Sequence, residues 1–69
     1  MKGAYHLAAG ILIGLVNDTW QARLVASLFW GGLALALPHL RFPGYPAVTA
    51  AVGYTAFAFA VATLASLVK

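Results

Sequence analysis

The chain has 69 residues, of which 64% are hydrophobic and only 7% charged, and its mean hydropathy is +0.94. Soluble domains are roughly 45–50% apolar and about 25% charged, so the composition predicts a single integral membrane unit over residues 1–69, with no soluble domain. The absence of cysteine excludes disulfides and thiolate sites. The few charged residues, with a net charge of +3, are too scattered for sequence-specific nucleic-acid binding.

The first apolar stretch, residues 3–16, predicts a short helix. At about 14 residues it lies where a short membrane span, an interfacial helix and the apolar part of a signal peptide look alike. Lys2 precedes it as a basic residue precedes a signal sequence, but no Ala-x-Ala cleavage pattern follows before Arg23. We therefore expect the segment to be retained.

The second apolar stretch, residues 24–37, predicts a helix over about 19–37. Asp18 followed by Gln21 fits a capping box, which places the start of the helix near Thr19. Pro38 lacks an amide proton and disfavours α geometry in the residue before it, so it ends the helix. Trp30 lies deep in this stretch, and its N–H needs a partner on a neighbouring helix.

The third apolar stretch, residues 47–68, follows a connection that holds all three prolines. About 22 helical residues reach ~33 Å, which is enough to cross a hydrocarbon core of ~30 Å unaided. Tyr54 lies inside this stretch, so its O–H also needs a partner. The short connection predicts antiparallel neighbours, and the fold class is all-α: a membrane helical hairpin preceded by a short apolar helix.

The basic residues lie at the ends of the apolar stretches. With three spans, Lys2 and Arg41 would share one side of the membrane, and Arg23 and Lys69 would share the other. With two spans, Arg41 would lie on one side of the membrane, and the other three basic residues would lie on the opposite side. The count of basic residues is level in the first case, so the orientation stays open.

Small residues at four-residue spacing recur in all three stretches, and the clearest pair is a Gly-x-x-x-Gly pattern in the first. In lipid, such residues let two helix backbones approach closely. Because they lie on several helix faces, we expect each subunit to contact several neighbours. The predicted helix-packing residues are Gly10, Gly14, Ser27, Gly31, Gly32, Ala36, Ala47, Ala51, Ala56 and Ala60.

Residues that could carry catalysis or bind a metal are scarce. The single acidic residue, Asp18, excludes a carboxylate pair, so we predict no enzyme and no catalytic residue. His6 and His39 are the only plausible ligands for a metal, haem or chlorophyll. Both lie near segment ends, so we expect interfacial histidines bonded to water or lipid, and no metal. Arg41, beside His39, either binds a lipid phosphate with its planar fork of donors or is an ordinary boundary arginine.

Two antiparallel apolar helices that are rich in Gly and Ala and joined by a tight basic turn resemble the conjugative pilins of type IV secretion systems. The likeness covers residues 19–69 as architecture. It implies a subunit that waits in the inner (cytoplasmic) membrane and is extracted with phospholipid into an extracellular helical filament. Arg41 and His39 would then hold the lumen-facing lipid headgroups, and bound phospholipid would be the only cofactor.

Two other functions fit the same sequence. One is an accessory or scaffolding subunit of a respiratory or photosynthetic membrane complex, which would also be small, cofactor-free and packed through small residues. The other is a holin-like pore former, although holins often carry a strongly charged tail and Lys69 stands alone here. The expected partners are copies of the chain itself, membrane phospholipid or a larger membrane complex.

Overall fold

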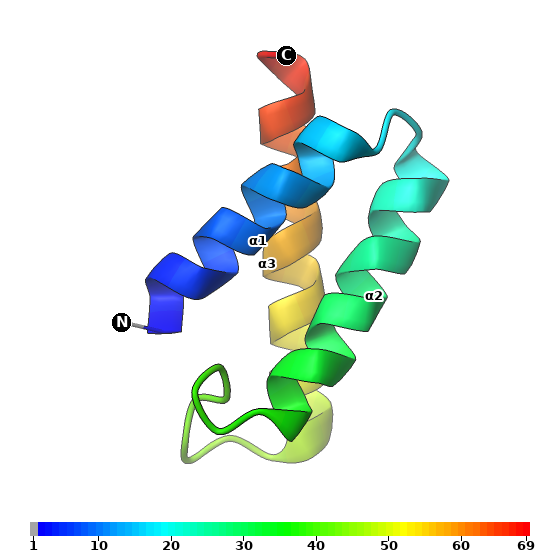
Figure 1. The fold of residues 1–69 in the computed structure, drawn as a ribbon. Coiled ribbons are helices and arrows are strands. Elements are labelled where there is room, and N and C mark those ends of the chain that lie inside the picture. Colours follow the sequence, from blue (N-terminus) through cyan, green and yellow to red (C-terminus); the bar gives the residue numbers. More distant parts are fainter. Residues whose placement is uncertain (1) are drawn as a thin grey trace.

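The computed structural model describes residues 2–69 as three α-helices joined by two loops (Figure 1). Helix α1 runs Lys2–Val16, α2 runs Trp20–Ala36 and α3 runs Ala47–Leu67. The predicted all-α class is confirmed, and the predicted helices over 3–16, 19–37 and 47–68 end within a residue of the observed bounds.

Helix α3 is central, since α1 and α2 both pack on it and make few contacts with each other. The chain reverses direction at each loop, so α2 and α3 are antiparallel neighbours, and α1 crosses α3 obliquely (Figure 1). The Cα trace measures 35 × 22 × 14 Å. The core is therefore a pair of thin seams, one on each side of α3.

Local signals account for the helix ends. The Thr19 side chain caps α2 by accepting a hydrogen bond from the backbone N–H of Ala22 at 3.2 Å. The predicted capping box was thus wrong by one residue, because the Asp18 carboxylate pairs with Lys69 instead. Leu37 has an extended backbone, with φ −100° and ψ 118°, so the predicted stop before Pro38 is confirmed.

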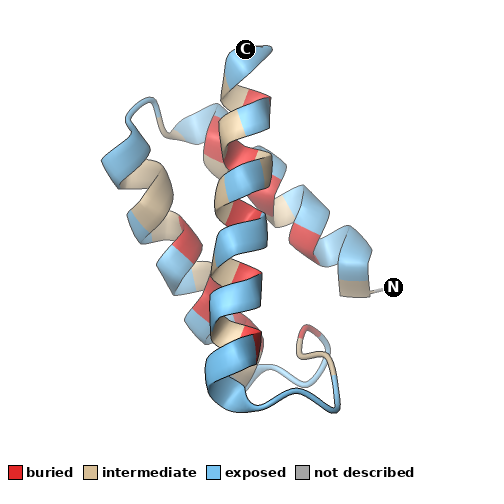
Figure 2. Cartoon of the chain, turned by 180° about the vertical axis from the view of Figure 1, so that it is seen from behind, coloured by how far each residue is buried: buried red, intermediate tan, exposed pale blue. Residues whose placement is uncertain are grey.

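The buried face of α3, which includes its seam with α1, consists mainly of small residues. Helix α3 presents a buried stripe with a repeat of three or four residues (Figure 2), formed by Ala50, Tyr54, Ala58, Ala62 and Ala65. On α1, a Cβ added at Gly10 would lie 2.6 Å from the Cβ of Val61, and one added at Gly14 would lie 2.9 Å from the Cα of Ala62. Only glycine allows the two backbones to come this close.

The predicted helix-packing residues fall into two groups. One group packs inside the chain: Gly10, Gly14, Ser27 and Gly31 are buried, and Ala51 is half-buried. The other group is exposed on the helices (Figure 2): Gly32, Ala36, Ala47, Ala56 and Ala60. The Gly-x-x-x-Gly pattern of α1 is therefore used within the chain, and only the second group is accessible to a neighbour.

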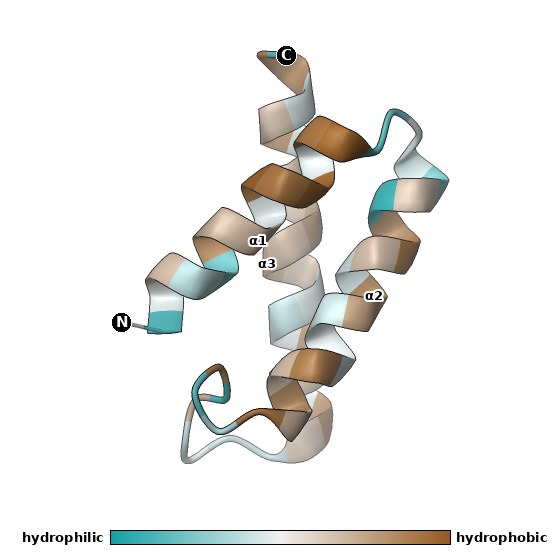
Figure 3. Ribbon diagram, in the orientation of Figure 1, coloured by the Kyte–Doolittle hydropathy of each residue, from teal (hydrophilic) through white to brown (hydrophobic). Residues whose placement is uncertain are grey.

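The described residues expose nineteen large hydrophobic side chains, on all three helices and in the adjoining segments. Hydrophobic stretches of ribbon accordingly occur in each helix (Figure 3). Within residues 2–69, α3 is the single helix long and apolar enough to cross a membrane. Within α3, an apolar segment of 18 residues is only 22% buried inside the chain. Helices α1 and α2 have 15 and 17 residues and are shorter.

Hydrophilic segments of the ribbon lie mainly toward the two ends of the molecule (Figure 3), and the charged residues are among them. At one end, the Lys2 ammonium donates to the backbone carbonyl of Arg41 at 2.6 Å. At the other end, Lys69 pairs with Asp18, and Arg23 donates to the Asp18 carbonyl. The helix faces between these two ends carry no charge in the described residues.

Candidate functional site

His6 is one of two buried polar residues in the described chain, and at 4% exposed it is the buried polar residue that carries an ionisable side chain. Its Nε2 lies 2.8 Å from the carbonyl oxygen of Leu40, in the loop between α2 and α3. Its Nδ1 accepts a hydrogen bond from the indole N–H of Trp30, on α2, also at 2.8 Å. The expectation of an interfacial histidine bonded to water or lipid was therefore wrong for His6.

These two partners define the tautomer of His6. An indole N–H can only donate, so Nδ1 must be the acceptor, and a carbonyl can only accept, so Nε2 must carry the proton. Both ring nitrogens of the neutral imidazole are thereby used inside the chain. The predicted need of Trp30 for an internal partner is confirmed.

Aromatic rings surround the imidazole. His6 stacks on Tyr54 of α3 with 4.7 Å between ring centroids, and it meets Trp30 edge-on at 5.5 Å. Phe42 of the loop lies at 5.7 Å. The Tyr54 hydroxyl accepts a hydrogen bond from the backbone N–H of Phe42 at 2.5 Å, which confirms that Tyr54 also needed an internal partner. Three helices and the loop thus meet at one cluster, His6, Trp30, Phe42 and Tyr54, which we call the histidine cluster.

The N-terminal part of α1 also binds backbone carbonyls of the loop between α2 and α3, which holds the three prolines. Lys2 donates to the carbonyls of Pro38 and Arg41, and His6 donates to that of Leu40. Loop carbonyls have no helix or sheet partner and must be satisfied in some other way when they are covered. Side chains of α1 therefore fix the position of the loop between α2 and α3.

A pocket of about 370 Å³ opens beside the histidine cluster, between the start of α1, the loop and the first half of α3. This volume falls in the range of about 300–1,000 Å³ that is typical of small-molecule sites. Its lining is almost entirely apolar, and it includes His6, Phe42, Tyr45, Gly53, Tyr54 and Phe57.

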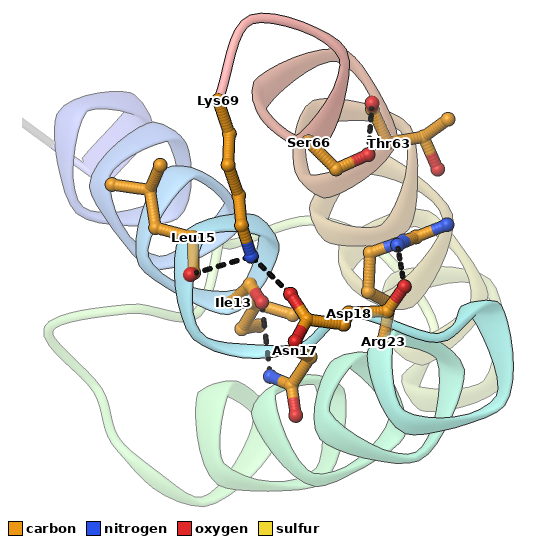
Figure 4. A network of polar contacts seen from close by, with 8 residues as sticks. All are labelled: Ile13, Leu15, Asn17, Asp18, Arg23, Thr63, Ser66 and Lys69. Carbon is orange, nitrogen blue, oxygen red and sulfur yellow. Dashed lines mark hydrogen bonds and ion pairs between the residues drawn. The ribbon is translucent and has the colours of Figure 1, made fainter.

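The opposite end of the molecule carries a second polar group (Figure 4). The Lys69 ammonium donates to the carbonyl of Leu15 at 3.0 Å and pairs with the Asp18 carboxylate, so it ties the end of α3 to the end of α1. The hydrogen bond and charge of Lys69, with a smaller contribution from the charge of Arg23, hold the pKa of Asp18 below its ordinary value of 3.8. This group fastens the seam between α1 and α3 at the end away from the histidine cluster.

The lowered pKa of Asp18 predicts how the stability of the fold changes with pH. A carboxyl group whose pKa is lower in the folded chain than in the unfolded chain stabilises the fold at any pH above the unfolded-state pKa. This stabilisation is lost as the pH falls through the folded-state pKa. Asp18→Asn should therefore lower the melting temperature slightly at pH 6, and the difference from the parent chain should vanish on acidification below the folded pKa. Circular dichroism melts between pH 6 and pH 2 measure this. A difference that grows on acidification would contradict the pairing.

The residues predicted to contact lipid headgroups lie together in the loop. His39 is exposed and Arg41 is half-buried, at the same end of the molecule as Lys2. No three potential metal ligands of the His, Cys, Asp or Glu type gather within residues 2–69. Comparison of the chain with protein families, with curated proteins and with solved structures finds no match. The function is therefore inferred from the residues and their geometry.

Proposed function

We propose that the chain is a non-enzymatic membrane subunit that associates with copies of itself through the outer face of α3. The observation that carries this proposal is that α3 is long and apolar enough to span a bilayer. Only 22% of its apolar 18-residue segment is buried by the rest of the chain. A core helix of a soluble protein is covered on its apolar face. Lipid and neighbouring helices would cover the remainder here.

The distribution of polar residues supports a membrane position for the whole bundle. The molecule is 35 Å long, and its charged residues lie at the two ends, which suits a hydrocarbon core of ~30 Å. Trp20 and Tyr45, both 57% exposed, lie near opposite ends, as aromatic side chains do at membrane interfaces. Three passes would place Lys2 and Arg41 on one side of the membrane and Arg23 and Lys69 on the other.

The surface proposed for self-association lies along α3 and its groove with α2. Ala56 and Ala60 are exposed one helical turn apart on α3. A groove of about 340 Å³, lined by Leu24 and Leu28 of α2 and by Ala56 and Phe59 of α3, runs beside them. Small residues beside an apolar groove allow a ridge of side chains from a second helix to enter.

The self-association surface can be tested with paired substitutions. Ala56→Leu together with Ala60→Leu should reduce the oligomer size, because two leucines prevent close backbone approach on that face. Ala4→Leu together with Ala8→Leu is the matched control, since these alanines are also exposed one turn apart, but on α1. Native mass spectrometry in mild detergent measures the subunit number. A monomeric parent chain, or equal subunit numbers in both variants, would refute the proposed surface.

A filament that carries phospholipid, as in conjugative pilins, is the form of assembly that we propose. The end of the molecule formed by Lys2, His39 and Arg41 supports it, because no acidic side chain accompanies these basic groups there. Electron microscopy and lipid analysis of material sheared from cells should find tubes that contain this chain and phospholipid. Recovery of the chain only inside a heteromeric membrane complex would instead favour an accessory subunit.

A further inference from the structure

The pocket beside the histidine cluster has the volume and lining of a site for an apolar ring. Its walls include the rings of Phe42, Tyr54 and Phe57, and such rings attract other rings in stacked or edge-on arrangements. Gly53 contributes open space, since a Cβ added there would meet nothing within 4 Å. Among residues 2–69, no Lys, Arg, Asp or Glu lines the pocket, so its described lining offers no partner for a charged ligand.

One hydrogen-bond donor in the pocket wall is left without an acceptor. Tyr54 is 8% exposed, and its hydroxyl oxygen accepts from the N–H of Phe42, but its O–H proton makes no hydrogen bond within residues 2–69. The hydroxyl is already paired as an acceptor, so its proton is free to donate to a ligand in the pocket. His6 cannot supply an acceptor, because both of its nitrogens are already engaged by Trp30 and Leu40.

Thr49 provides a second hydroxyl in the pocket wall, and it too makes no hydrogen bond in the described chain. Two hydroxyl donors in an otherwise apolar aromatic pocket suit a ligand that accepts hydrogen bonds and carries no charge. We propose that the pocket binds a quinone, with one ring carbonyl accepting from the Tyr54 hydroxyl and the apolar tail leaving through the open side. This ligand site does not depend on self-association.

The chain offers its own reporter for binding. Trp30 lies 5.5 Å from His6, which lines the pocket, whereas Trp20 is exposed at the other end of the molecule. In the Trp20→Phe protein in detergent micelles, decylubiquinone should quench the fluorescence of Trp30 along a saturable curve. A linear dependence on quinone concentration, as free quinone in the micelle would give, would overturn the proposal.

Two glycines supply a matched pair of variants, because both lie in helices and both have open space around an added Cβ. Gly53→Leu fills the pocket and should raise the Kd for decylubiquinone at least tenfold. Gly32→Leu, on the outer surface of α2, should leave the Kd unchanged. Equal Kd values for the two variants would overturn the location of the site. Circular dichroism on each sample confirms that the helix content is kept.

The carbonyl contact is tested separately from the location. Removing the donor in Tyr54→Phe should raise the Kd roughly three- to tenfold, the range set by one neutral hydrogen bond. Thr49→Val should raise it by no more than this. Decylbenzene, which lacks a carbonyl, should compete poorly with decylubiquinone. Equal competition would overturn the quinone assignment, and measuring oligomer size on the same samples separates this outcome from a failure of self-association.

Discussion

Gly14→Ala is expected to destabilise the folded chain by about 1–3 kcal/mol, although alanine is the better helix former. The added methyl group would meet the Ala62 carbonyl and lie 2.9 Å from the Ala62 Cα, and these are backbone atoms that cannot rotate away. α1 must therefore move off α3, which loosens the seam that also carries Gly10. Thermal melts followed by circular dichroism in one detergent measure the change.

Gly32→Ala is the control for this substitution, and its effect should have the opposite sign. Gly32 is also inside a helix, but an added Cβ there meets nothing within 4 Å. The gain in helix propensity should then stabilise the chain by up to about 1 kcal/mol. If both variants shifted the melting temperature in the same direction, the close approach of α1 to α3 would be contradicted.

His6→Phe is expected to cost about 2–6 kcal/mol of folding free energy, because a somewhat larger aromatic ring replaces the imidazole and two covered polar groups lose their partner. The indole N–H of Trp30 and the carbonyl of Leu40 both depend on the imidazole. Each buried group left unpaired costs about 1–3 kcal/mol. Chemical denaturation followed by circular dichroism measures the loss.

Two further variants test whether the loss arises at the histidine cluster. His39→Phe, at an exposed position in the loop, should change stability by no more than about 0.5 kcal/mol. In the double variant His6→Phe with Trp30→Phe, the unpaired indole N–H is gone, so the two losses should be less than additive by about 0.5–3 kcal/mol. Strict additivity would show that the hydrogen bond between the two rings does not contribute.

Helix bounds could be predicted from the sequence because the signals that set them are local. A proline after Leu37 and a hydroxyl at Thr19 act on their nearest neighbours, whatever the rest of the chain does. Even so, the exact cap was missed, because Asp18 has a distant competing partner in Lys69. Competition of this kind is visible only once α1 and α3 lie side by side.

The histidine cluster could be predicted only in part. That Trp30 and Tyr54 require partners follows from placing an N–H and an O–H in apolar stretches. His6 reaches Trp30 only because the glycines of α1 pack at a particular height along α3. No local sequence pattern predicts that height. Similarly, the small-residue spacing predicted close packing but could not separate contacts inside the chain from those between chains, since both need the same residues.

The seam between α1 and α3 joins the first helix to the last, and this sets an order for biosynthesis. The bond between the Leu15 carbonyl and Lys69 links residues that are 54 apart in sequence. At about 5–20 residues per second, a ribosome needs roughly 3–11 s to make that interval. During this time the glycine face of α1 has no partner within the chain, so the seam can close only after α3 has been made.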